Sequence, residues 1–159
     1  MQSRPVLIYG TLSAVSLLAL VLTRDRTRTN EVLPLVHRIK VPGYRLCSVR
    51  GKTYPAFIQD ASSWFNGILL WPLTASQRQI INKYEERGSY RRVETTVALQ
   101  DVHGNFAYLA VDIYIWDGEA LELDPTSPWS IDTWTHKHLD KMLDWYDAEK
   151  VQRNDLNDD

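Results

Sequence analysis

The chain has 159 residues, 44% of them hydrophobic, and a net charge of −2. This length fits one domain with a sizeable core, and the lack of a basic charge excess argues against nucleic-acid binding. A single cysteine, Cys47, excludes an intrachain disulfide and fits a reducing compartment, so we expect a cytoplasmic protein in which Cys47 is a buried structural thiol.

The apolar segment at residues 6–22 has the character of a signal peptide or a membrane anchor, but a glycine and several hydroxyl residues interrupt it. It is too short and too polar for a spanning helix. Val6–Tyr9 instead predicts a buried strand, Gly10 a turn with a backbone conformation closed to other residues, and Ser13–Leu22 a buried helix. We therefore expect no membrane association, and a charged surface loop from Thr23 to Glu31.

The middle of the chain has the pattern of short strands separated by turns. The predicted strands are Leu33–Val41, Tyr44–Val49, Thr53–Ile58 and Phe65–Pro72, with turns at Pro42-Gly43 and Arg50-Gly51. Thr74 then precedes a helical pattern over Ala75–Glu85 and is its predicted N-cap.

The second half of the chain predicts two long strands and a closing helix. The strands are Tyr90–Leu99 and Phe106–Trp116, joined by a turn over Asp101–Asn105, and the helix covers Ser130–Ala148. Strands joined by short turns, with few helices, predict an α+β fold built on a mixed, curled sheet. We expect a single domain over residues 1–148, followed by a flexible acidic tail over residues 149–159.

Two short segments could carry chemistry. The segment Tyr9–Leu12 lies where a strand feeds a helix, and amides at a helix start can hold a carboxylate. The second is the acidic pair Glu85 and Glu86, which point in different directions on a helix. If one of them faces an aromatic cavity, desolvation will raise its pKa and suit it to general acid–base work. Surface exposure is the alternative for either acid.

Other kinds of site find no support in the sequence. None of the four histidines has metal-ligand spacing with another histidine or with Cys47, and glycine-rich phosphate loops and a nucleophile elbow are missing. We therefore expect neither a metal nor an organic cofactor.

Taken together, these segments resemble the γ-glutamylcyclotransferase-like superfamily, in particular a fungal branch related to plant avirulence-induced proteins. The likeness covers roughly residues 5–147 and depends on the order of six degenerate motifs. These are Val6–Leu12, Pro42–Arg45 with Tyr54–Ile58, Gly67–Thr74, Asn82–Glu85, Tyr90–Val93 and Tyr114–Trp116 before the closing aromatic helix.

The resemblance implies a small mixed, barrel-like sheet with flanking helices around one cavity. It also implies a cofactor-independent enzyme of the acyltransferase or lyase type, in which the α-amine of a γ-glutamyl group attacks its own side-chain carbonyl. The products are 5-oxoproline and a free amine, and one carboxylate serves as base and then as acid. By position that carboxylate is Glu85, with Glu86 as the alternative. The implied substrate-binding residues are Tyr9, Gly10, Thr11, Leu12, Tyr54, Tyr90, Tyr114 and Trp116.

The sequence departs from the family pattern around the acid. The family has a tyrosine four residues after its catalytic acid, whereas Tyr90 lies five after Glu85 and four after Glu86. A one-residue insertion before Tyr90 reconciles the two counts and favours Glu85. The usual aspartate before the acid is Asn82 here, which leaves the substrate open.

Three functions therefore remain open at the level of the sequence. The first is release of 5-oxoproline from a γ-glutamyl amide, in glutathione-conjugate turnover or in specialised metabolism. The second is a redirected acid–base isomerisation, elimination or cyclisation of a hydrophobic metabolite in the same cavity. The third is non-catalytic binding of a small molecule. Each implies a small-molecule partner, and a homodimer stays open.

Overall fold

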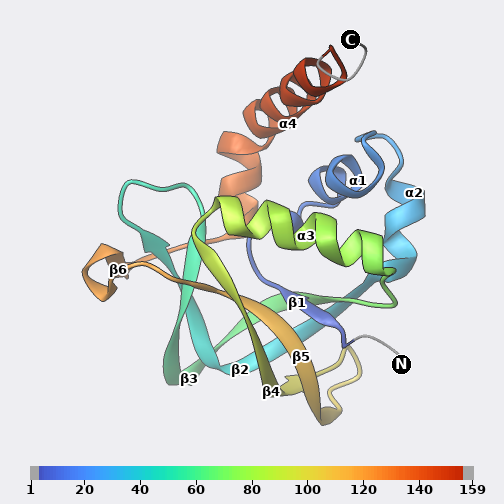
Figure 1. The fold of residues 1–159 in the computed structure, drawn as a ribbon. Helices are drawn as coiled ribbons and strands as arrows, with labels where there is room; N and C mark the ends of the chain where they lie inside the picture. The colour runs from blue at the N-terminus through green and yellow to red at the C-terminus, as the bar shows by residue number, and fades with distance from the viewer. Residues whose placement is uncertain (1–3, 156–159) are drawn as a thin grey trace.

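Five strands close into a barrel, and helices gather at one end of it (Figure 1). The computed structural model describes the backbone of residues 4–155 and the side chains of residues 4–149. The strands are β1 (Val6–Ile8), β2 (Val36–Val49), β3 (Pro55–Leu70), β4 (Tyr90–Gln100), β5 (Phe106–Trp116) and β6 (Leu123–Pro128). The helices are α1 (Val15–Thr23), α2 (Thr29–Val32), α3 (Ala75–Arg87) and α4 (Ile131–Asp155), with 3-10 turns η1 (Thr11–Ser13), η2 (Leu33–Leu35) and η3 (Ala120–Glu122).

The barrel strands follow the order β3-β1-β5-β4-β2, and β2 pairs back to β3 to close the ring. The β1–β5 pair is parallel and the other pairs are antiparallel, while β6 adds to β2 outside the ring. The predicted α+β fold with a mixed, barrel-like sheet is therefore confirmed.

Strand β2 corrects the prediction of two strands separated by a turn at Pro42-Gly43. It is one strand with a bulge between Pro42 and Tyr44, because both of its halves pair with β3. Gly43 has a φ of +86°, which lets the strand bend there without leaving the sheet.

Strand β3 is likewise one long strand where two were predicted. Its pairing with β2 moves from Trp64 to Gln59, so the polar residues between them bulge out of the ladder. Strand β6 was not predicted at all, because two prolines in Leu123–Pro128 are unfavourable for a strand.

The elements around α3 agree closely with the sequence. Thr74 Oγ1 accepts a hydrogen bond from the Gln77 amide at 3.1 Å, and Gln77 Oε1 accepts one from the Thr74 amide at 2.9 Å, which makes a capping box. The predicted β4–β5 hairpin is also present, with Asp101 Oδ1 accepting hydrogen bonds from the amides of His103 and Asn105.

Helix α4 continues beyond the predicted end at Ala148 and runs to Asp155. Glu149 pairs with Arg87 of α3 at 2.9 Å, which holds α4 against α3 past that point. Residues 156–159 of the predicted tail lie outside the described residues, and the flexibility of the tail stays a prediction.

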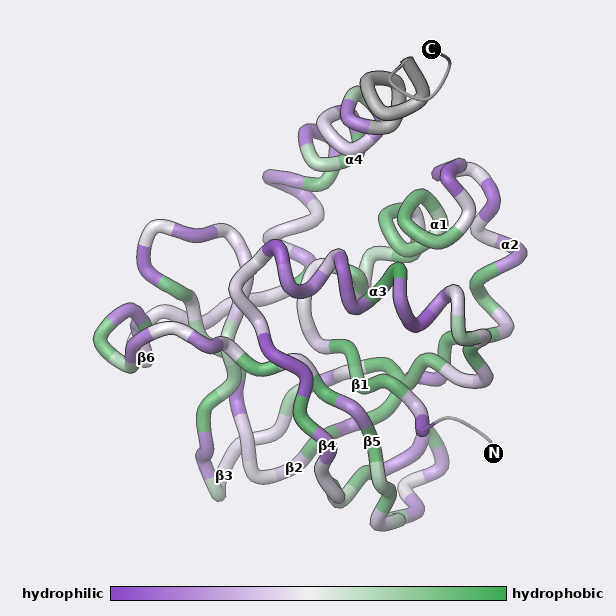
Figure 2. The backbone as a smooth tube through the Cα atoms, viewed as in Figure 1, coloured by the Kyte–Doolittle hydropathy of each residue, from purple (hydrophilic) through white to green (hydrophobic). Residues whose placement is uncertain are grey.

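The N-terminal apolar segment forms a buried strand and a buried helix, as predicted. The side chains of Leu17, Leu18 and Leu20 on α1 are fully buried, and Figure 2 shows α1 as an almost entirely hydrophobic stretch beside the more polar α3. Over residues 4–155, the helices all lack the combination of length and apolarity needed to cross a bilayer. Cys47 on β2 is also fully buried, as predicted, and burial raises the pKa of its thiol.

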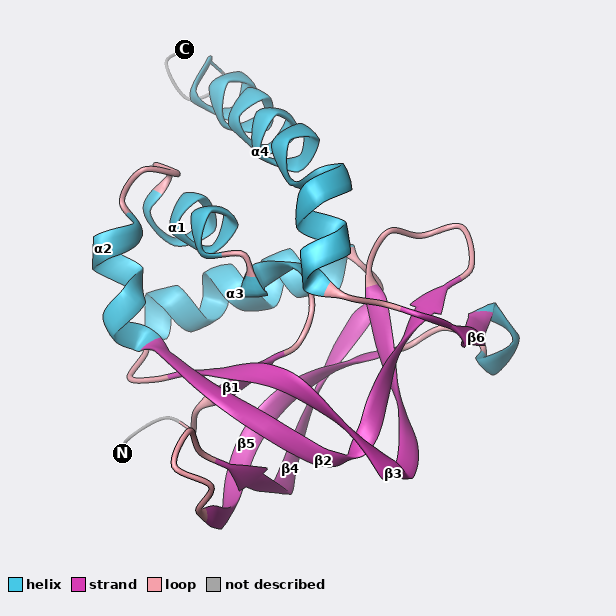
Figure 3. Cartoon of the chain, turned by 180° about the vertical axis from the view of Figure 1, so that it is seen from behind, coloured by secondary structure: helices cyan, strands magenta, loops and turns pink. Residues whose placement is uncertain are grey.

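A buried ion-pair network fixes α3 to the barrel. The carboxyl of Asp112 on β5 is almost completely buried and bonds to Arg4 Nε at 3.1 Å and to Arg78 Nη2 from α3. Seen from behind in Figure 3, α1 and α3 lie at the end of the barrel, while α4 projects away from it. The network therefore sets the position of the helix that carries both candidate acids.

Candidate active site

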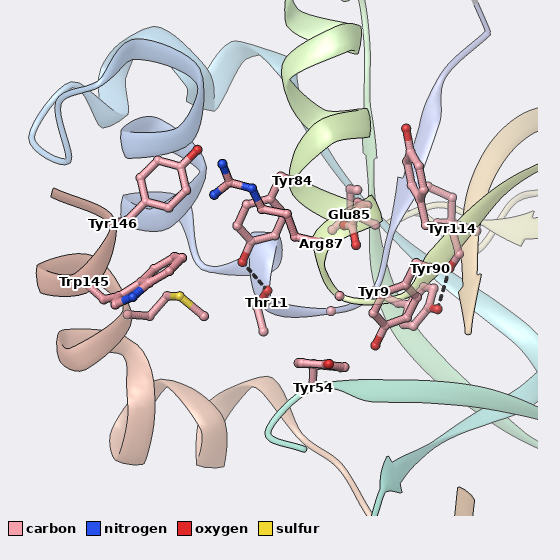
Figure 4. Close-up of a pocket in the computed structure, with 15 residues that line it drawn as sticks. Tyr9, Thr11, Tyr54, Tyr84, Glu85, Arg87, Tyr90, Tyr114, Trp145 and Tyr146 are labelled. Carbon is pink, nitrogen blue, oxygen red and sulfur yellow. Dashed lines mark hydrogen bonds between the residues drawn. The ribbon is translucent and has the colours of Figure 1, made fainter. Parts of the chain in front are cut away.

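A cavity of about 170 Å³ lies where the end of β1, the C-terminal turn of α3, strands β4 and β5, and α4 meet (Figure 4). Most of its lining is aromatic or aliphatic. The lining residues are Leu7, Ile8, Tyr9, Gly10, Thr11, Tyr54, Tyr84, Glu85, Arg87, Gly88, Tyr90, Tyr114, Met142, Trp145 and Tyr146. The structure thus brings together seven of the residues that the sequence singled out, which are Tyr9, Gly10, Thr11, Tyr54, Glu85, Tyr90 and Tyr114.

Glu85 lines this cavity from the last turns of α3. Its carboxyl receives no hydrogen bond and no ion pair from the side chains described, and burial raises its pKa to about 8. Glu86 is exposed instead and accepts a hydrogen bond from Asn82 Nδ2 at 2.7 Å. Of the two acids, Glu85 is therefore the one that faces the cavity.

Helix α3 and strand β4 are joined by a short turn over Gly88 and Ser89, which lies between Glu85 and Tyr90. The Gly88 amide donates to the Glu85 carbonyl at 3.0 Å, and Ser89 takes a φ of +64° before β4 begins. The Ser89 carbonyl accepts a hydrogen bond from the amide of Asp117 at 3.0 Å. This turn leaves both Glu85 and Tyr90 at the cavity, and the insertion inferred from the sequence stays a prediction.

Four tyrosine hydroxyl groups at the cavity already form hydrogen bonds with other groups of the protein. The bonds are Tyr9 OH to the Tyr114 carbonyl at 2.5 Å, Tyr90 OH to the Pro55 carbonyl, Tyr114 OH to Asn82 Oδ1 at 2.9 Å, and Tyr84 OH with Thr11 Oγ1 at 2.8 Å. These phenols therefore position the walls of the cavity and one another.

Burial raises the pKa of each of these phenols, and the neighbouring carboxyl of Glu85 raises it further. The pKa of Tyr114 rises to about 12. The phenols thus stay protonated at neutral pH, and among the residues that line the cavity only Glu85 carries a carboxyl group.

The loop after β1 differs in detail from the prediction. Gly10 has a φ of −101° and a ψ of −144°, so it does not adopt the positive φ that favours glycine. A Cβ at this position would lie 3.6 Å from Pro55 Cδ, which is an ordinary contact. Gly10 precedes the single turn η1, whose first amides lack intrahelical acceptors.

Two predicted substrate-binding residues do not line the cavity. Leu12 is fully buried in the core, and Trp116 packs against the rings of Tyr54 and Tyr90 with centroid distances of 6.3 and 5.9 Å. Both residues belong to the predicted elements, but their side chains point into the packing behind the wall.

The α4 wall of the cavity, formed by Met142, Trp145 and Tyr146, was not predicted as part of the site. The i, i+4 spacing of Met142 and Tyr146 predicts a shared helix face, yet nothing in the sequence indicates which element that face contacts. Within residues 4–149, groups of three or more His, Cys, Asp or Glu side chains placed to share a metal ion are absent.

A small closed barrel with one unpartnered carboxyl of raised pKa in an aromatic cavity is typical of a small-molecule-binding domain with a single candidate acid–base group. Comparison with known families is in agreement with that class. The model of the family described as "Gamma-glutamyl cyclotransferase, AIG2-like" matches residues 6–136, and the chain belongs to this family. The family is one of cyclotransferases that act on small molecules.

Two plant relatives are similar to most of the chain. The chain is 27% identical to AIG2-like protein D of Arabidopsis thaliana over 140 residues, which cover 87% of this chain and 83% of the relative. It is 24% identical to protein AIG2 C of the same plant, over 91% of this chain and 80% of the relative.

The solution structure of the Arabidopsis thaliana protein At3g28950.1 matches 99% of this chain and 87% of its own, with a TM-score of 0.59 and 21% identity. That of At5g39720.1 matches 92% and 89%, with a TM-score of 0.58 and 20% identity. At these identities the two structures show a shared fold. The expected placement in a fungal branch stays a prediction.

Proposed function

We propose that the protein releases 5-oxoproline and a free amine from a γ-glutamyl amide, with Glu85 as the catalytic acid–base group. The observation that supports this proposal most is the carboxyl of Glu85, which lines the cavity without a partner among the described side chains. Membership of the cyclotransferase family makes a γ-glutamyl compound the first substrate class to consider.

The proposed reaction balances with one carboxylate. Glu85 removes a proton from the α-ammonium of the γ-glutamyl group, and the freed amine attacks the γ-carbonyl carbon. A new C–N bond closes the five-membered ring, the attacking nitrogen loses its second proton, and the C–N bond to the leaving amine breaks. Glu85 relays both protons in turn to the leaving nitrogen, so the amine departs as an ammonium ion and Glu85 is again a carboxylate. Because attacking and accepting atoms belong to one molecule, orientation supplies much of the rate.

Burial of Glu85 suits both proton transfers. Its pKa of about 8 lies within about two units of that of an α-ammonium group, so neither direction of transfer is strongly uphill. A solvent-exposed glutamate with a pKa of 4.5 would be a weaker base. It would also lose the abstracted proton to water before that proton could be passed to the leaving nitrogen. The neutral phenols of Tyr9, Tyr90 and Tyr114 keep the surroundings uncharged.

The substrate carboxylate has a proposed location at the loop after β1. The amides of Thr11 and Leu12 open the turn η1, and Gly10 lies at the edge of the cavity. Backbone N–H groups at such a turn attract an anion. Under this proposal Leu12 contributes its backbone amide, since its side chain is buried in the core.

The test is 5-oxoproline release from a panel of γ-glutamyl amides, measured for the wild type, Glu85→Gln and Glu86→Gln. We expect Glu85→Gln to lower kcat/KM by at least about 100-fold and Glu86→Gln, on the exposed side of the same turn, to leave it within about twofold. Wild-type kcat/KM should fall about tenfold per pH unit below pH 8, because only the carboxylate form of Glu85 is a base.

Two outcomes would redirect the proposal. The aromatic and aliphatic lining also suits proton transfer on a hydrophobic molecule without a γ-glutamyl group. Another activity that Glu85→Gln abolishes, with no 5-oxoproline from any amide, would favour that second function. A ligand that binds unchanged and equally well to Glu85→Gln would favour a non-catalytic binding protein.

A further inference from the structure

The cavity has two chemically different ends. Glu85 lies at one end with Tyr9, Tyr90 and Tyr114, and the α4 wall of Met142, Trp145 and Tyr146 forms the other (Figure 4). The hydrogen-bonded pair Tyr84–Thr11 lies between the two ends in this view. A molecule that reacts at Glu85 and fills the cavity will therefore place its remainder against the α4 wall.

The α4 wall is held in place by contacts with α3. Arg87 Nη1 pairs with Glu149 Oε2 at 2.9 Å, and the rings of Tyr84 and Tyr146 lie 6.3 Å apart. Among the described residues that line the cavity, Arg87 is the one with a cationic side chain. Its ion pair with Glu149 offsets this charge. The α4 end thus offers no free positive charge to a substrate carboxylate.

The α4 wall presents exposed aromatic surface at the cavity. The indole of Trp145 is 51% exposed although it lies at the cavity, and it meets the ring of Tyr146 at 6.2 Å and 63°. Covering exposed indole surface with an apolar group lowers the free energy, because apolar surface leaves water. Aromatic rings also pack well edge-to-face against an indole. A carboxylate placed there would lose its hydration and would meet Arg87 only in competition with Glu149.

Taking the proposed cyclotransferase reaction as given, we propose that the amine it releases carries an aryl or large aliphatic group and no carboxylate. The γ-glutamyl group lies at the Glu85 end, and the apolar group of the amine packs on Met142, Trp145 and Tyr146. The C–N bond that breaks joins these two parts. Glu85 protonates the nitrogen of the leaving amine, as it would for any γ-glutamyl amide in this reaction.

The experiment compares γ-glutamyl-2-phenylethylamide, γ-glutamyl-ethylamide and γ-glutamyl-phenylalanine by the rate of 5-oxoproline release. We expect kcat/KM for the phenylethylamide to exceed that for the other two by at least about tenfold. Trp145→Ala should remove most of this preference by lowering kcat/KM for the phenylethylamide about tenfold, with little effect on the ethylamide. Trp145→Phe keeps a ring and should keep most of the preference.

The matched control is Lys141→Ala, one turn earlier on α4, because Lys141 is exposed and does not line the cavity. It should leave all three rates unchanged. Equal rates for the three amides, or a Trp145→Ala loss of equal size on each, would refute the apolar leaving group while the proposed reaction stands. No 5-oxoproline from any of them would refute the proposed reaction itself and this inference with it.

Discussion

Replacing Glu85 by glutamine should make the protein more stable, by an amount that grows with pH. The pKa of Glu85 rises from its ordinary 4.5 to about 8 on folding, because the carboxyl leaves water for the cavity. Between these two pH values the folded protein holds a proton that the unfolded chain has released. The contribution of Glu85 to the free energy of unfolding therefore falls as pH rises from 4.5 to 8 and changes little at higher pH.

The size of this effect follows from the pKa. Each pH unit between the two values costs about 1.4 kcal/mol, so Glu85 lowers the stability of the wild type by about 3 kcal/mol at pH 7 relative to pH 4.5. The loss relative to pH 4.5 is about 4 kcal/mol at pH 8 and increases little at higher pH. A glutamine amide is neutral at every pH and loses nothing over this range.

The assay is urea unfolding, followed by tryptophan fluorescence, at several pH values from 4.5 to 9. The difference in the free energy of unfolding between Glu85→Gln and the wild type removes the contribution of every other titrating group. We expect this difference to rise by about 3 kcal/mol from pH 4.5 to pH 7. Glu86→Gln, an exposed neighbour on the same helix, should differ from the wild type by less than about 0.5 kcal/mol throughout.

A constant difference across the pH range would refute the reasoning, because it would mean that Glu85 titrates alike in the folded and unfolded chains. So would a wild type that gains on the variant as pH rises, since that requires a pKa lowered by a favourable partner. In either case the carboxyl would lack the raised pKa on which the proposed acid–base role depends.

Two further pairs of substitutions test the framework that holds the site. Asp112→Asn should lower the free energy of unfolding by roughly 3 kcal/mol in chemical denaturation, because it removes the counter-charge of the mostly buried Arg78, whereas Arg4 keeps its pair with Glu94. Asp117→Asn, at an exposed ion pair, should cost less than about 1 kcal/mol, and equal losses for the two would contradict this account. Gly43→Ala should cost about 1 kcal/mol because of its φ of +86°, whereas Gly10→Ala, with φ of −101°, should change stability by less. The same denaturation measurements check this pair, and a larger loss at Gly10 would count against the geometry of the bulge at Gly43.

The sequence by itself determined the elements whose signals are local. The capping box at Thr74 and Gln77 and the turn between β4 and β5 follow from residues within five positions of each other. Where a local signal competed with pairing to a distant strand, as at Pro42-Gly43, the pairing prevailed and the chain stayed in the sheet. Strand β6 had no local signal to find.

Only the tertiary structure decided which groups at the site are chemically available. Glu85 and Tyr9 are far apart in the chain, yet both are buried at the same cavity, and burial raises the pKa of each. The neighbouring Glu85 carboxyl raises the pKa of Tyr9 further. The outward direction of Glu86 and the contact between α3 and α4 through Arg87 and Glu149 depend in the same way on how separate elements pack. Residue order can place an acid on a helix, but its solvation and protonation depend on what the rest of the chain brings around it.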